Sequence, residues 1–157
     1  MNTKRARFLA EGAMIAALYV ILTYLSMMLG LDKLVVQCRF SEALTVLPVI
    51  TGAAIPGLFI GCLVSNILTG CALWDVVFGS FATLLAAIVT RSIKKAPYLA
   101  SIPPIIANTL VIPPVLNFVY HVDTALPFIY LTVFLGEVVS CGVLGTCLLR
   151  YIKRYKK

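Results

Sequence analysis

Long apolar runs alternate with short polar breaks along the chain, and their spacing predicts six helical segments. The first run covers residues 8–30 and the last 127–150, and each provides the ~20 residues that a membrane-spanning helix needs. Four further runs lie between them, at 41–51, 56–70, 74–91 and 99–119. The runs 41–51 and 56–70 are short for ~30 Å of hydrocarbon at ~1.5 Å per residue. We therefore expect a bundle that is thin, tilted or locally re-entrant there.

Several residues mark the expected helix ends. Ser41 is placed to cap the second helix, and Glu42 falls in its first turn, where the helix dipole favours a carboxylate. Pro56 suits the first turn of the third helix. The pair Pro113-Pro114 lies inside the fifth run, where it is expected to kink or break the helix.

Composition places these segments in a membrane. Apolar residues make up 61% of the 157 residues and charged residues only 12%, whereas soluble domains carry ~25% charged residues. The mean hydropathy is +1.02. This excludes an ordinary soluble enzyme, a disordered chain and a secreted disulfide scaffold. We predict an all-α integral membrane protein with six transmembrane helices, forming a single transmembrane domain over residues 1–157.

The basic residues indicate an orientation. Eleven of the 13 Lys and Arg residues lie at the amino end, in the loop 91–95 or in 150–157, all on one side of a six-span bundle. The positive-inside rule then predicts that both termini are cytoplasmic, with a basic cytoplasmic tail at 151–157 and an extracellular loop at 31–40. The net charge of +7 is explained by this topology, so no nucleic-acid partner is expected.

Motifs for nucleotide, metal and redox chemistry are missing. The chain has no G-x-x-x-x-G-K-[ST] loop, so ATP-driven transport would need another subunit to hydrolyse the nucleotide. Its five cysteines have no C-x-x-C spacing, and it has one histidine. We expect no metal, no cofactor and no catalytic residues.

Small residues recur at four-residue spacing in three of the runs, and in the fourth run they are Gly79, Thr83 and Ala87. Ala13 and Ala17 form such a pair in the first run, offset by one from Gly12 and Ala16. A longer ladder follows the third run through Ala53, Gly57, Gly61, Ser65 and Thr69. Such faces let helices approach closely in lipid, either inside the bundle or against another membrane subunit.

Polar side chains inside the apolar runs are the candidates for a binding site. They are Glu42, Asn66, Asn108, Asn117 and Glu137. Helix rise places Asn108 and Glu137 each ~15 Å from the outer end of its run, so the two can share one depth. A carboxylate at that depth is expected to have a partner and to face a cavity. A purely structural hydrogen bond between helices is the alternative for both residues.

Further polar and aromatic residues gather at the predicted outer rim. Together with Glu42, they are Gln37, Arg39, Trp74, Asp75, Tyr120, His121 and Asp123. With the buried carboxylates they predict a pocket that opens outward and has an acidic floor and aromatic walls. Such a pocket suits a small, planar, hydrogen-bonding and cationic ligand. Simpler interpretations remain open: Arg39 and Glu42 can pair with each other, and Trp74 and Tyr120 can belong to the interfacial aromatic belt.

Four stretches of the sequence resemble the QueT family. They are 11–19, 37–48, 54–66 and 75–80, and the run Q-x-R-x-S-E-A-L that begins at Gln37 is the most specific. QueT proteins are S components, the substrate-binding membrane subunits of energy-coupling factor (ECF) transporters for a queuosine precursor. The resemblance implies a six-helix S-component fold. It also implies a transmembrane coupling subunit and two cytoplasmic ATPases as partners.

The resemblance also implies roles for particular residues. Ala13 and Ala17 match the A-x-x-x-A pattern that docks the coupling subunit, and 31–40 matches the loop that acts as a lid. The implied ligand is 7-aminomethyl-7-deazaguanine or a relative, whose ring N–H groups and ammonium suit carboxylates. Two alternatives remain: an S component for another vitamin, and a small membrane enzyme that uses Glu42, Asp75 and His121 as acid and base.

Overall fold

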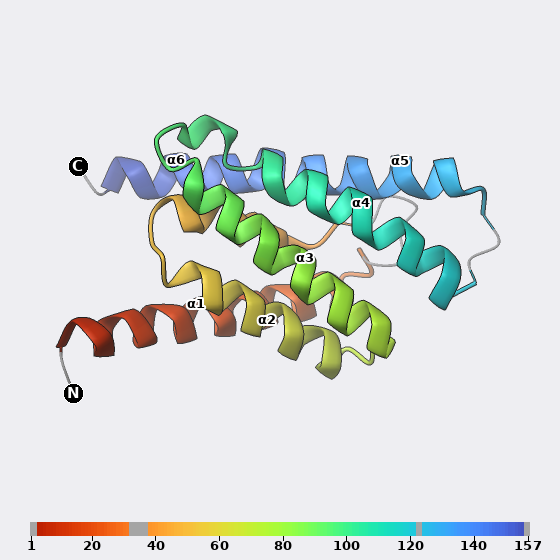
Figure 1. Ribbon diagram of the computed structural model, residues 1–157, viewed down its shortest axis with the longest axis horizontal. Helices are drawn as coiled ribbons and strands as arrows, with labels where there is room; N and C mark the ends of the chain where they lie inside the picture. Colours follow the sequence, from red (N-terminus) through yellow and green to blue (C-terminus); the bar gives the residue numbers. More distant parts are fainter. Residues whose placement is uncertain (1–2, 32–37, 122–123, 156–157) are drawn as a thin grey trace.

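The structure, a computed structural model, describes residues 3–31, 38–121 and 124–155, and every regular element in these ranges is a helix. Figure 1 shows how they are arranged. The elements are α1 (Thr3–Met28), η1 (Phe40–Val49), α2 (Ala54–Leu68), α3 (Leu73–Ser92), η2 (Pro97–Leu99), α4 (Ile102–Val119), α5 (Leu126–Glu137), η3 (Val138–Gly145) and α6 (Thr146–Tyr155). The last three form one continuous rod. The predicted all-α fold with six helical segments is confirmed.

Four of the helical segments are long and apolar enough to cross a membrane. They are Thr3–Met28, Leu73–Ser92, Pro97–Val119 and Leu126–Tyr155. The two short segments are η1 and α2, with 10 and 15 residues, at the places where the sequence predicts short helices. The protein is therefore a multi-pass membrane protein whose bundle is locally short.

The segments predicted to be cytoplasmic lie at one end of the molecule. Both termini and the turn that joins α3 to α4 stand at the same end of the long axis, and the α2–α3 and α4–α5 connections stand at the other (Figure 1). The fold thus gathers the three basic segments at one end. That this end is cytoplasmic remains a prediction.

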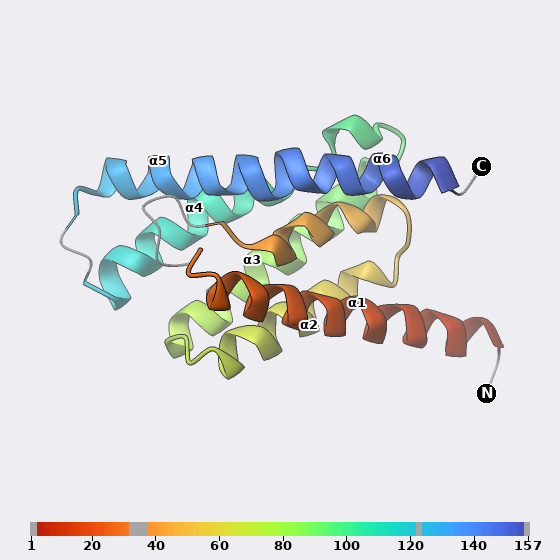
Figure 2. The same cartoon turned by 180° about the vertical axis from the view of Figure 1, so that it is seen from behind.

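The short helix η1 forms the core of the bundle. It runs between α1 and the rod, as Figure 2 shows in orange, and every residue from Ser41 to Val49 is buried. It is a 3-10 helix, and at ~2.0 Å per residue its 10 residues extend ~20 Å, further than the same number in an α-helix. The predicted cap at Ser41 is wrong: the helix begins at Phe40, and Thr23 donates a hydrogen bond to the Ser41 hydroxyl at 2.9 Å. At the other end of η1, Arg91 donates to the Pro48 carbonyl at 3.0 Å.

Glycines bring α1 and α2 into direct backbone contact. A Cβ atom added at Gly57 would lie 2.6 Å from the Gly12 carbonyl oxygen, and one at Gly61 would lie 2.7 Å from the Tyr19 Cβ. The ladder of the third run therefore serves packing inside the bundle. Ala13 and Ala17 lie on the exposed side of α1, away from this contact.

The helix α4 continues through Pro113 and Pro114. The helix is therefore not broken there, although neither proline can donate a backbone hydrogen bond. The other expected outcome, a kink, stays a prediction. Pro113 is buried in the bundle, whereas Pro114 is half-buried and lines an apolar groove between α3 and α4. Neighbouring helices hold α4 in place there, because it packs against α3 on one side and α5 on the other.

Candidate functional site

A polar cavity lies inside the bundle, where η1 begins between α2, α3, α4 and α5. Its volume is ≈ 40 Å³, which is space for a few water molecules at ~10–15 Å³ each. Six of its lining residues are ionisable or amide side chains: Arg39, Glu42, Asn66, Asp75, Asn108 and Glu137. The remaining walls are small or apolar and come from Cys62, Gly79, Thr83, Ile112 and Val133.

Asn108 joins two carboxylates at the inner end of this cavity. Its side-chain amide donates to Glu137 Oε1 at 3.0 Å and to Glu42 Oε2 at 3.3 Å. The depth arithmetic from the sequence therefore placed Asn108 and Glu137 correctly. Both amide hydrogens are committed to carboxylates, so the side-chain carbonyl oxygen is the group that Asn108 can offer to a ligand.

Glu42 is held from its other side by Tyr19 of α1. The Tyr19 hydroxyl donates to Glu42 Oε1, and both side chains are buried, at 1% and 4% exposure. The alternative in which Arg39 pairs with Glu42 is not what the fold shows. Among the described residues these two form no ion pair, and Arg39 donates instead to Asn66 Oδ1 at 3.3 Å.

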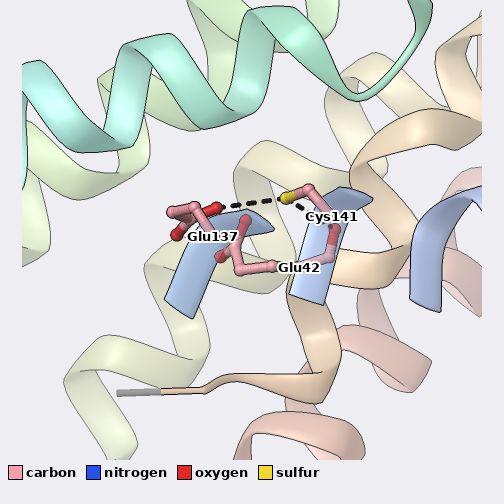
Figure 3. A group of neighbouring side chains, drawn as sticks. All are labelled: Glu42, Glu137 and Cys141. Atoms are coloured by element: carbon pink, nitrogen blue, oxygen red, sulfur yellow. Dashed lines mark hydrogen bonds between the residues drawn. The ribbon is translucent and has the colours of Figure 1, made fainter. Parts of the chain in front are cut away.

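Glu137 stands at the junction between α5 and the π-helix η3, a wider turn that places the buried Cys141 beside Glu137. The Cys141 thiol donates to Glu137 Oε2 at 3.1 Å. Figure 3 shows Glu42, Glu137 and Cys141 converging. One potential ligand atom from each of the three lies within 4.8 Å of the others, as a metal site would require. Cys141 is hydrogen-bonded both to Glu137 and, at 3.4 Å, to the Glu42 backbone carbonyl, so we interpret the three residues as a hydrogen-bonded cluster at the inner end of the cavity.

The end of the cavity nearest the α2–α3 connection, here called its outer end, combines a cation with a carboxylate. Arg39 and Asp75 both line it, and Asp75 is 5% exposed. Tyr120, just beyond the end of α4, donates to Asp75 Oδ2 at 3.2 Å and accepts from the Ala72 backbone N–H at 2.9 Å. Partial burial raises the pKa of Tyr120 to about 12, so its hydroxyl stays protonated and keeps this bond at neutral pH.

The two ends of the cavity differ in what they offer a ligand. At the inner end the donors of Tyr19, Asn108 and Cys141 all point at the two carboxylates. Hydrogen-bond acceptors are therefore what the two carboxyl groups leave for a ligand there. At the outer end, Arg39 adds donors beside the Asp75 carboxylate. Such a cavity fits a ligand with a cationic or N–H-rich end and a second end that both donates and accepts.

The other candidate residues lie elsewhere. Asn117 is half-buried and does not line the cavity, because nine residues, or ~2.5 turns, separate it from Asn108 and turn it to the opposite side of α4. Trp74 stacks on Phe78 in an apolar groove between α3 and α4. His121 is exposed, with a φ of 49°. Gln37, Asp123 and most of the predicted lid 31–40 lie outside the described residues.

Sequence reasoning missed several residues of the site, above all Tyr19, Cys62, Thr83 and Cys141. Tyr19 had a detectable signal, since it begins a polar stripe at helical spacing that continues through Thr23 and Ser26 on the inner side of α1. The two cysteines gave none, because a small residue in an apolar helix is usually a packing residue.

Comparison with known families gives one match. The model of the QueT transporter family matches residues 9–154, nearly the whole chain. Neither the curated proteins nor the solved structures contain a match.

Proposed function

Because the chain belongs to the QueT transporter family, we propose that it captures a queuosine precursor outside the cell for uptake by an ECF transporter. The family is a transporter family, so the protein is a membrane transport subunit of the S-component type and not an enzyme. A lipid bilayer and a small-molecule substrate follow from this. The substrate, the coupling to ECF subunits and the ATP-driven step are the proposal.

The single observation that supports this substrate is the inner end of the cavity. Two carboxylates, Glu42 and Glu137, accept from the same Asn108 amide, and Tyr19 and Cys141 each donate to one of them as well. A ligand must therefore bring its own donors, and an ammonium group is the strongest candidate beside two carboxylates. In 7-aminomethyl-7-deazaguanine, the aminomethyl group is such a cation.

The two ends of the cavity suggest how this ligand lies. The ammonium would lie beside Glu42 and Glu137. The guanine-like edge would then face the outer end, where Asp75 accepts from ring N–H groups and Arg39 donates to the ring carbonyl. The cavity has room for a few water molecules only, so we propose that the side chains or helices that line it move apart when this ligand binds.

Coupling to the energising subunits is proposed for the outer side of α1. Ala13 and Ala17 are exposed there, whereas Gly12 and Gly57 are used in contacts between α1 and α2. A pair of small residues on an outward face allows close approach of a second membrane helix. The partners would be the transmembrane coupling subunit and, through it, two cytoplasmic ATPases.

An S component for a different vitamin is the remaining alternative, and ligand identification separates the two. The protein is purified gently from cells supplied with 7-aminomethyl-7-deazaguanine, and the bound small molecules are measured by mass spectrometry. Recovery of the deazapurine at about one per chain is expected. A different vitamin in its place, with no binding of the deazapurine by calorimetry, would reject this substrate.

The enzyme alternative has no support in the fold. It required Glu42, Asp75 and His121 to act together, but His121 is exposed and does not line the cavity that contains the other two.

A further inference from the structure

Three consecutive inward-facing polar residues of α1 hold the first three residues of η1. Tyr19 donates to Glu42, Thr23 donates to the Ser41 hydroxyl at 2.9 Å, and the Phe40 backbone N–H donates to the Ser26 hydroxyl at 2.8 Å. Each step of about one turn toward the end of α1 therefore corresponds to a step of one residue toward the start of η1. The three hydrogen bonds form a ladder between the two helices, and of the residues that form it Glu42 lines the cavity.

Tyr19 has little freedom to move within this ladder. Its side chain is 1% exposed. Its Cβ packs directly against Gly61, since a Cβ atom added to that glycine would lie 2.7 Å from the Cβ of Tyr19. The phenol therefore reaches Glu42 from a fixed position. Its hydroxyl holds Oε1, and Asn108 holds Oε2 at 3.3 Å, so the plane of the carboxylate is set from both sides.

We propose that Tyr19 is a positioning residue for ligand selectivity, because it orients the Glu42 carboxylate toward the cationic end of the ligand. This inference rests on the proposed function, in which an ammonium lies beside Glu42 and Glu137. Tyr19 acts through Glu42 and makes no contact with the ligand itself. Without its hydroxyl, one oxygen of Glu42 loses its donor, and the carboxylate can rotate away from the ammonium.

The test compares two probes on the purified chain in detergent by calorimetry. The first is 7-aminomethyl-7-deazaguanine, and the second is 7-methyl-7-deazaguanine, which keeps the ring but lacks the ammonium. The affinity for the aminomethyl compound divided by the affinity for the methyl compound measures how well the site recognises the cation. Tyr19→Phe is expected to lower this ratio by about 10-fold, the lower end for one hydrogen bond to a charged group. A merely structural role would weaken both probes equally and leave the ratio unchanged.

Tyr24→Phe is the matched control, because Tyr24 lies on the same helix and its hydroxyl donates to the Leu68 carbonyl, away from the cavity. It should keep the wild-type ratio. In a Glu42→Gln background, Tyr19→Phe should change the ratio no further, because its effect passes through that carboxylate. An unchanged ratio in Tyr19→Phe, or a full 10-fold loss in the Glu42→Gln background, would overturn the proposal.

Tyr19→Met gives the same test by a second route if Tyr19→Phe does not fold. It removes the same hydroxyl with a flexible apolar side chain and leaves Glu42 unchanged, so the ratio should again fall, and a wild-type ratio would again reject the proposal. Failure of the proposed function looks different. In that case the wild-type chain would bind neither probe, or would bind both equally.

Discussion

Asn108 of α4 donates its side-chain amide to Glu137 of α5 at 3.0 Å, across 29 residues of sequence. The same nitrogen also donates to Glu42, so two carboxylates from separate elements share one donor inside the membrane domain. Two like charges at one point are costly in an apolar medium unless a cation or a proton joins them. This explains why the inner end of the cavity is the part of the protein most suited to a cationic ligand.

Neutralising either carboxylate should weaken binding of 7-aminomethyl-7-deazaguanine. Glu42→Gln and Glu137→Gln keep side-chain size but remove charge-assisted hydrogen bonds worth ~1.5–3 kcal/mol, so affinity should fall roughly 10- to 150-fold. Calorimetry on monodisperse protein measures this. Glu11→Gln is the control, because Glu11 bonds to Arg7 and Thr51 outside the cavity. Wild-type affinity in both cavity variants would remove the acidic floor from the proposal.

The two asparagines of α4 should respond differently. Asn108→Leu leaves Glu42 and Glu137 without their shared donor, at ~1–3 kcal/mol for each buried group that loses its partner. Both the unfolding midpoint and the affinity for the deazapurine should therefore fall. Asn117 lies on the opposite side of the same helix, so the affinity of Asn117→Leu for the deazapurine should match that of the wild type. If Asn117→Leu abolished binding while Asn108→Leu did not, the ligand would lie outside this cavity.

The contact between α1 and α2 should not tolerate a side chain at Gly57. In Gly57→Ala the new methyl would lie 2.6 Å from the Gly12 carbonyl oxygen, which is backbone and cannot rotate away. We expect a loss of ~1–3 kcal/mol, seen as a lower midpoint in thermal unfolding. Gly142→Ala is the comparison, because its nearest neighbours would be side-chain atoms at 3.8 Å. Equal midpoints for the two variants would contradict the close packing.

Docking of the coupling subunit should depend on the outer side of α1. Ala13→Trp combined with Ala17→Trp fills that face and should block co-purification with the ECF module. Ligand binding by the isolated chain should survive, since these residues lie away from the cavity. Leu85→Trp, at a similarly exposed position on α3, should leave assembly intact. Normal assembly and transport in the double variant would assign docking to another face.

The predicted orientation places the turn after α3 inside the cell and the connection before α5 outside. Lys94→Cys and Thr124→Cys, each introduced into a cysteine-free background, test it with a membrane-impermeant thiol reagent on intact cells. Thr124→Cys should react, and Lys94→Cys should react only after the cells are opened. The reverse pattern would invert the topology.

The sequence by itself determined the helices and their approximate ends. It also determined that two of them are short for crossing a membrane. It could do so because hydrocarbon requires every backbone hydrogen bond to be made within the segment, which leaves helices as the available structure for such apolar runs. It also determined depth along each helix, because the rise per residue is fixed, and this placed Asn108 level with Glu137. The 3-10 form of η1 was not predictable in this way, because an apolar run is compatible with either type of helix.

Only the tertiary structure decided which side of each helix faces inward. In a soluble helix the apolar side marks the core, but in lipid both the core and the outer surface are apolar, so the pattern carries little information about rotation. This is why Asp75 and its neighbour Trp74, both candidates from the sequence, separate into the cavity and an outward groove. It is also why the part played by Tyr19 emerged from the fold: its partner Glu42 lies on another segment, and only packing brings the two together.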